Sequence, residues 1–242
     1  MNGELGRMIM GRKFLAAVLT AMAGIAFGAA YPEIRELLTP GSFLSLEKDA
    51  LLSKTVAFLL PVAAVLPWSD SFLGEWKSGF LKSSLPRCGR RSYVESKVLT
   101  VALSGFLAWV LAGVLMLGIY FIIYFPLEQQ GSISLSAVTD FVAVLIRAGL
   151  TGGVVSTLGG ICAVVSESIY MAWGLPFVGW YFCMILQERY VSGALWLYPP
   201  EWLKAEAQWG VNGLGLWLFL LLFLLSAMGI LGGVLYEKLT SI

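Results

Sequence analysis

The chain has 242 residues, of which 58% are hydrophobic and only 13% are charged, and its formal net charge is +1. Together with a mean hydropathy of +0.82, this composition lies outside the range of soluble domains and indicates a polytopic membrane protein. The sequence holds no histidine, which excludes histidine-based catalytic triads, histidine-ligated metal sites and histidine proton switches.

Six apolar runs predict an all-α fold of six transmembrane helices in one domain, because about 20 apolar residues cross a bilayer. The first run follows Arg7, Arg12 and Lys13, which favour entry from the cytoplasm; a cleaved signal peptide is the alternative. Pro61 and Pro67 predict that the second span is kinked. The spans are expected at 14–31, 55–73, 98–124, 134–165, 169–186 and 213–236.

The segments around these runs differ in character. Residues 32–54 mix acids and bases and suggest a structured loop or a short amphipathic helix. Residues 187–212 are dense in Trp and Tyr, which favour the membrane interface and suggest a short re-entrant segment. The fourth run carries a face of small residues that would allow close helix packing in the bundle interior. These small residues are Gly149, Gly152, Gly153, Ser156, Gly159 and Gly160.

Basic residues predict the orientation of the chain. With both termini and the polar stretch 66–97 in the cytoplasm, ten basic residues lie inside and five lie outside, which is the bias of the positive-inside rule. The inner set is Arg7, Arg12, Lys13, Lys77, Lys82, Arg87, Arg90, Arg91, Lys97 and Lys238; the outer set is Arg35, Lys48, Lys54, Arg189 and Lys204.

The stretch 66–97 is the only long polar interruption of the apolar chain. Its apolar positions recur at steps of three and four, which predicts an amphipathic helix along the inner interface that ends near Leu85. Pro86 and Gly89 then break the helix, and Arg90 and Arg91 open a second segment that enters the third span. A plain cytoplasmic loop whose bases touch lipid phosphates is the other interpretation. The apolar positions are Phe72, Leu73, Trp76, Phe80, Leu81 and Leu85.

Three runs in this stretch carry a resemblance to a known family: LPWSDSF from Leu66, EWKSGF from Glu75 and RCGRRSYVESK from Arg87. An acidic residue, a Gly a few positions later, then an Arg and a Tyr-x-x-x-Lys at the start of the next span resemble the ABC-2 type permease family. The six-span layout with this segment between spans two and three is similar as well.

The resemblance implies that residues 74–97 form a coupling helix and elbow that dock on a separate ATP-binding subunit. It places Glu75, Lys77, Gly79 and Phe80 on the docking helix, with Arg87, Tyr93 and Lys97 on the elbow beside Arg90 and Arg91. Trp76 departs from the family, in which many relatives carry a charged residue there. No G-x-x-x-x-G-K-[ST] occurs in the chain, so ATP and Mg²⁺ would be bound by the partner ATPase and no cofactor by this chain.

Three further charged residues are candidates for a role. Asp140 and Arg147 fall within the fourth run, seven positions apart and about 10 Å apart along a helix, too far for a direct pair. Because a charge in a membrane segment is costly, they are candidates for the translocation path or for interhelical contacts, with plain structural roles as the alternative. Glu167, at the expected inner turn after the fourth span, is a candidate for a second cytoplasmic contact or a solvated turn residue.

Two functions remain as hypotheses. The first is the permease subunit of an ABC exporter in a bacterial plasma membrane, paired with a second permease chain and an ATP-binding subunit, surrounded by membrane lipids and without nucleic acid. A peptide, drug or lipid-like molecule would be its substrate, and the chain itself would not be an enzyme. The second is a membrane scaffold or sensor subunit that binds lipid or a signalling partner through its basic stretch.

Overall fold

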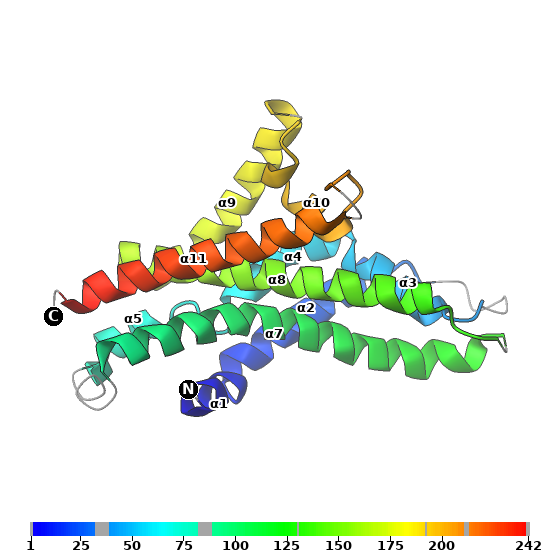
Figure 1. The fold of residues 1–242 in the computed structure, drawn as a ribbon. Coiled ribbons are helices and arrows are strands. Elements are labelled where there is room, and N and C mark those ends of the chain that lie inside the picture. The colour runs from blue at the N-terminus through cyan, green and yellow to red at the C-terminus, as the bar shows by residue number, and fades with distance from the viewer. Residues whose placement is uncertain are drawn as a thin grey trace.

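A computed structural model describes residues 2–31, 39–81, 89–129, 131–191, 193–210 and 213–240, and every regular element in these residues is a helix (Figure 1). The α-helices are α1 (Asn2–Ile9), α2 (Arg12–Gly28), α3 (Ser42–Leu51), α4 (Lys54–Val65), α5 (Ser71–Lys77), α7 (Arg90–Tyr124), α8 (Leu135–Ser166), α9 (Ile169–Arg189), α10 (Pro199–Lys204) and α11 (Leu214–Thr240); two 3₁₀ turns, η1 (Phe125–Leu127) and η2 (Leu195–Leu197), complete the set.

Four helices are long and apolar enough to cross a membrane: α7 with η1, α8, α9 and α11. The prediction of an all-helical protein with membrane-spanning segments is therefore confirmed at this level. The remaining two predicted spans correspond to shorter helices, since α2 has 17 residues and α4 has 12.

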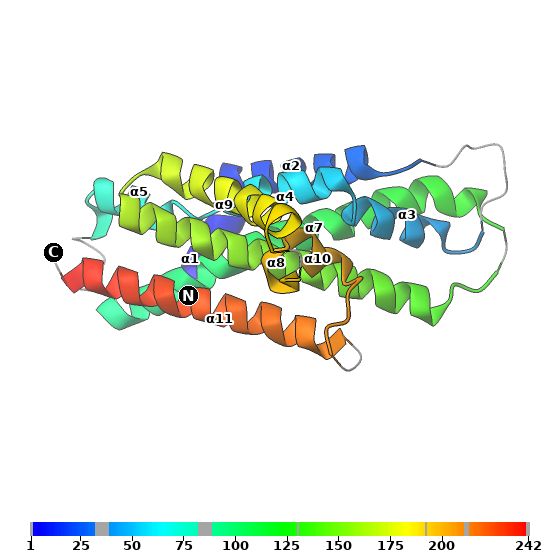
Figure 2. The ribbon, with the colours of Figure 1, turned by 90° about the horizontal axis from the view of Figure 1, so that it is seen from above.

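Helix α8 forms the centre of the molecule. It packs against α3, α4, α7, α9 and α11, and 72% of its most apolar window is buried. Figures 1 and 2 show it running alongside α7 and α11. The closest approach to α7 uses glycine on both helices, because a Cβ atom added to Gly105 would lie 2.2 Å from the carbonyl oxygen of Gly152. The predicted close packing of the small residues in this helix is confirmed.

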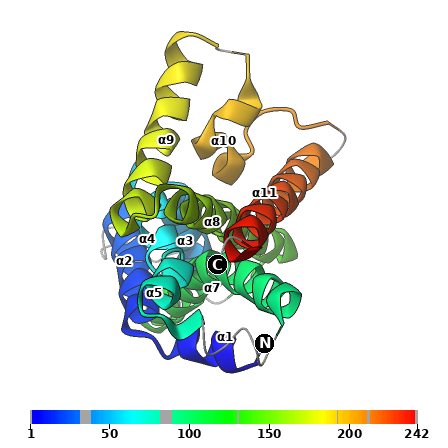
Figure 3. The same ribbon diagram turned by 90° about the vertical axis from the view of Figure 1, so that its left-hand side faces the viewer.

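Helix α9 departs from the direction of the long helices and rises away from them (Figures 1 and 3). Only 11% of its most apolar window is buried, and side chains such as Val178, Phe182 and Ile185 are more than half exposed. The beginning of α9 nevertheless packs closely, since a Cβ at Gly159 of α8 would lie 2.9 Å from the Ala172 carbonyl oxygen. The aromatic segment after α9 returns to the bundle through α10, where Trp202 packs edge-on against Trp180 at 5.9 Å.

The elements divide between the two ends of the bundle (Figure 2). One end holds α5, the C-terminal part of α11 and the turn at Glu167. At this end α1 packs against the start of α7. The opposite end holds α3, whose N-terminus is capped by Glu128: the carboxylate accepts from the amides of Gly41 and Phe43 at 2.8 and 3.1 Å and from the Ser42 hydroxyl at 2.6 Å. Both described chain ends thus lie toward the α5 end.

The polar stretch differs from the single helix predicted up to Leu85. Helix α5 ends at Lys77, and Gly79 follows with a φ of +73° and donates its amide to the Trp76 carbonyl at 3.0 Å. A glycine in this left-handed conformation ends a helix without the steric cost that a Cβ would bring. Residues 82–88 lie outside the described residues, so the structure does not place Lys82, Leu85, Arg87 or Cys88.

Candidate functional site

A buried group of charges joins α1, α5 and α7. The ammonium of Lys97, a fully buried side chain on α7, lies 3.0 Å from a carboxylate oxygen of Glu75 on α5 and also forms an ion pair with Glu4 on α1. Its environment includes aromatic faces, since the ammonium lies 5.8 Å from the ring centre of Trp68 and 5.5 Å from that of Tyr93. Such partners offset the cost of burying an ammonium group away from water.

Hydrogen bonds complete this group. The Tyr93 hydroxyl donates to Glu75 Oε2 at 2.5 Å, and the Ser96 hydroxyl donates to Glu4 Oε2 at 2.9 Å. The guanidinium of Arg7 lies 3.6 Å from the other oxygen of Glu75. Two acids and two bases therefore balance in charge. We refer to the six residues Glu4, Arg7, Glu75, Tyr93, Ser96 and Lys97 as the Lys97 cluster.

The local sequence explains how these side chains meet. Tyr93 and Lys97 stand four residues apart on α7, so they project from one face of the helix. On α5, Phe72 and Leu73 are buried and anchor the helix, which turns Glu75 toward α7. Gly89, with a φ of +71°, allows the chain to turn into α7 directly before this face begins.

A second ion pair lies beside the cluster. The Lys13 ammonium on α2 donates to the buried carboxylate of Asp70 at 2.6 Å. Between this pair and the Lys97 cluster lies a groove of about 300 Å³ that reaches Arg7, Glu75 and Phe80. We call this the α5 groove; it is also lined by Lys13, Pro67, Trp68, Asp70, Ser71, Gly74 and Ser78.

The structure gathers only some of the predicted coupling residues. Glu75, Tyr93 and Lys97 form the core of the Lys97 cluster. Trp76 packs against Phe72, and the Lys238 ammonium lies 4.5 Å from the centre of the Trp76 ring in a cation–π contact.

The other predicted coupling residues lie toward the surface. Phe80 is 44% exposed at the rim of the α5 groove, with the Arg7 guanidinium 5.7 Å from its ring centre. Lys77, Gly79, Arg90 and Arg91 are exposed, and Arg91 pairs with its neighbour Glu95 at 2.9 Å.

Asp140 and Arg147 do not come together as a pair. Asp140 is exposed at the α3 end, where the Lys48 ammonium lies 3.4 Å from its carboxylate. Arg147 lies about two turns further along α8 and is half-buried, and its Nε finds no hydrogen-bond acceptor in the described part of the chain. Asp140 thus contacts α3 through Lys48, and the role of Arg147 in a translocation path or an interhelical contact stays a prediction.

Glu167 contacts the end of α11. It occupies the turn after α8 with a φ of +53°, and its carboxylate accepts a hydrogen bond from Lys238. This bond holds the pKa of the Glu167 carboxyl below its ordinary value. The residue is exposed at the same end of the molecule as α5.

The sequence did not reveal several polar contacts between the helices. Glu4 and Ser96 belong to the Lys97 cluster, but a pattern search along one helix cannot reveal partners that lie 92 positions apart. Ser69, Ser104 and Ser156 meet between the second apolar segment, α7 and α8, with hydroxyl oxygens 3.1 and 3.2 Å apart. Their positions within apolar runs offered the only signal.

The described residues contain no group of three or more acidic or cysteine side chains placed to hold a metal ion. The Lys97 cluster holds α1, α5 and α7 together at one end of the bundle, because its charges are costly to separate. Comparison with family models and with curated proteins gives no match to this chain.

Proposed function

We propose that this chain is the transmembrane permease subunit of an ATP-driven ABC transporter, an exporter of a peptide, a drug or a lipid-like substrate. The observation that carries the proposal is the Lys97 cluster. Glu75, Tyr93 and Lys97 come from the motif that resembles ABC-2 permeases, and they form one hydrogen-bonded and ion-paired unit between α5 and α7, with Tyr93 and Lys97 buried. A force applied to α5 would pass through this unit into a membrane-spanning helix.

In this proposal six spans cross the membrane. Helix α2, at about 26 Å, and α4 with the turn up to Asp70 join the four long apolar helices. The α5 end, with its excess of basic residues, faces the cytoplasm, in keeping with the positive-inside rule. Both termini then lie in the cytoplasm of a bacterial cell.

The partner would be a separate ATP-binding subunit, which binds ATP and Mg²⁺, and a second permease chain completes the transporter. Phe80 at the rim and the groove behind it are the proposed contact with the ATPase. Closure of the ATPase dimer pushes α5, and the Lys97 cluster transmits the shift to α7. Helix α8 moves with α7 because glycines on both helices pack in close contact.

The test is co-purification of the intact chain with the ATPases encoded by neighbouring reading frames, followed by ATPase assays in proteoliposomes. Phe80→Ala should lower the stimulation of the ATPase by at least about fivefold, since truncation of an interface anchor typically costs more than 1 kcal/mol. The matched control is Phe182→Ala, which removes a ring that is 60% exposed on α9.

If no ATPase co-purifies, or if the two variants behave alike, the permease proposal fails. A membrane scaffold or sensor, the other candidate from the sequence, predicts no change in conformation with ATP. Protease accessibility of the α5 region with and without ATP separates the two functions.

A further inference from the structure

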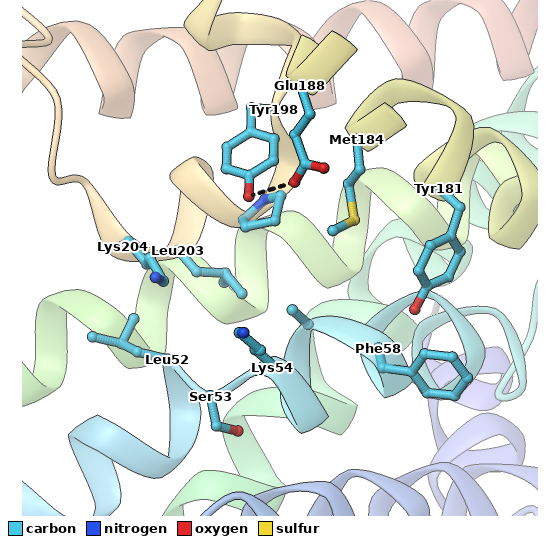
Figure 4. Close-up of a pocket in the computed structure, with 12 residues that line it drawn as sticks. Leu52, Ser53, Lys54, Phe58, Tyr181, Met184, Glu188, Tyr198, Leu203 and Lys204 are labelled. Carbon is cyan, nitrogen blue, oxygen red and sulfur yellow. Dashed lines mark hydrogen bonds between the residues drawn. The ribbon is translucent and has the colours of Figure 1, made fainter. Parts of the chain in front are cut away.

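A second hollow lies away from the Lys97 cluster, where the N-terminal end of α4, the C-terminal end of α9 and the short helix α10 meet (Figure 4). Its volume is about 350 Å³, which is in the range of small-molecule sites. We call it the α4–α10 pocket. The Lys97 cluster and the α5 groove share no residue with it.

The pocket combines basic groups with an apolar wall. Lys54 and Lys204 line one side, as Figure 4 shows. Phe58, Tyr181 and Met184 line another, and the rings of Phe58 and Tyr181 lie 5.6 Å apart. A hydrocarbon or aromatic moiety would find contacts on this wall while a charged group reached the lysines.

The balance of charge in the pocket is positive. Among the described residues that line it, the one carboxylate is that of Glu188, which accepts a hydrogen bond from the Tyr198 hydroxyl at 3.2 Å. Lys204 forms an ion pair at 3.6 Å with Glu206, whose side chain is mostly exposed. Lys54 forms no ion pair with any acid among the described residues. The pocket therefore presents two ammonium groups to a ligand that brings negative charge, and of these Lys204 already has a mostly exposed acidic partner.

We propose that the α4–α10 pocket binds an anionic amphiphile, whose phosphate or carboxylate contacts Lys54 and Lys204 and whose apolar part packs on Phe58, Tyr181 and Met184. Such a molecule can come from the surrounding bilayer or can be the transported substrate. Entry from the bilayer is open because neighbouring side chains on α9, such as Phe182 and Ile185, are exposed. Binding itself does not depend on the proposed transport function.

The binding test uses the full chain in nanodiscs of phosphatidylcholine and two fluorescent probes with identical acyl chains, phosphatidylglycerol and phosphatidylcholine. Lys54→Gln and Lys204→Gln should each weaken the binding of phosphatidylglycerol roughly five- to tenfold and leave the binding of phosphatidylcholine unchanged. Lys48→Gln is the matched control, because Lys48 pairs with Asp140 outside the pocket. Phe58→Ala should weaken both probes.

Equal affinity for the two probes, or an equal loss in the Lys48→Gln variant, would overturn the proposal. The source of the ligand is decided by a second arm, in which the same phosphatidylglycerol is added to the chain together with its ATPase partner. Stimulation of ATP hydrolysis that Lys54→Gln abolishes identifies a transported amphiphile, whereas selective binding without stimulation identifies a bilayer lipid. Since the binding arm needs no ATPase, its failure and the failure of the permease proposal are distinguishable.

Discussion

The ammonium of Lys97 lies 3.0 Å from the carboxylate of Glu75 although the lysine side chain has no exposed surface. Glu4 supplies the second negative charge and Arg7 the second positive one. Because the four charges balance, the cluster avoids the large penalty of an isolated ion in an apolar surrounding. The same balance makes each member dependent on the others, so α1, α5 and α7 are expected to move as one body.

Lys97→Met should destabilise the protein by about 3–5 kcal/mol, because it leaves the buried carboxylate of Glu4 and the partly buried carboxylate of Glu75 without their common partner. The measurement is the free energy of unfolding in detergent micelles. Arg91→Ala is the control: Arg91 and Glu95 form an ion pair on α7 as well, but both side chains are mostly exposed, and such pairs contribute little. An equal, small effect of the two substitutions would show that Lys97 is not held by its charge.

The double variant Lys97→Met with Glu75→Gln should recover part of the lost free energy of unfolding, since it removes one of the two carboxylates that lack their lysine partner. A double-mutant cycle over Lys97 and Glu75 then measures their coupling, which we expect to be about 1–3 kcal/mol. Additive losses would mean that Glu4 alone compensates Lys97.

Gly105→Ala should separate α7 from α8. The new methyl group would meet the Gly152 carbonyl oxygen at 2.2 Å, a backbone atom that cannot move aside alone. We expect a loss of about 1–3 kcal/mol in the free energy of unfolding. Gly229→Ala on α11 is the matched control, because nothing lies within 4 Å of its new Cβ and alanine favours a helix over glycine. A neutral Gly105→Ala would contradict the close packing.

Ser156→Ala tests the serine contacts between the same helices. The Ser156 hydroxyl donates to the Val101 carbonyl at 2.9 Å and meets the hydroxyls of Ser69 and Ser104. Its removal leaves buried polar groups with fewer partners and should cost about 1–3 kcal/mol. Ser226→Ala, which removes an exposed hydroxyl that donates to the Phe223 carbonyl within α11, should change the unfolding midpoint little. Equal effects would show that the buried contacts add no stability.

The sequence predicted the long helices well because hydropathy acts over many residues. The expected span 134–165 differs by one residue at each end from the helix Leu135–Ser166, and the expected span 213–236 begins one residue before the helix Leu214–Thr240 and ends inside it. The third helix begins at Arg90, where the sequence places the opening of the segment that enters the span expected from residue 98. Its first two turns carry polar residues that become buried only through contacts with α1 and α5.

Features set by tertiary packing could not be predicted. The direction of α9 depends on its packing against α8 and α4. Its own apolar sequence resembles that of any membrane span and does not predict this direction. The candidate site was predicted in part. Glu75, Tyr93 and Lys97 belong to a sequence motif, whereas Glu4 lies far away in the sequence and joins the site only because α1 packs against α7. Glu47 was missed because Lys48 and Asp49 beside it look like a solvated surface.

Glu47 is a fully buried carboxyl on α3, and neither of its oxygens has a hydrogen-bond partner in the described residues. Its Oε1 lies 3.6 Å from the place a Cβ would take at Gly113, so the missing side chain of α7 leaves room for the carboxyl. Burial disfavours the charged form and raises the pKa of Glu47 to about 8. The folded protein therefore keeps this carboxyl protonated at neutral pH.

The raised pKa of Glu47 predicts that stability falls as pH rises. The unfolded chain releases this proton near the ordinary carboxyl pKa of about 4.3, whereas the folded chain holds it up to about pH 8. Between these values the free energy of unfolding should drop by up to about 1.4 kcal/mol per pH unit and then level off. Glu47→Gln, whose amide cannot ionise, should lose this part of the slope, while Asp49→Asn, at an exposed neighbour, should keep it. The measurement is the unfolding midpoint in detergent from pH 5 to pH 9; a Glu47→Gln profile parallel to that of the unmodified chain would show that Glu47 is already ionised in the folded state.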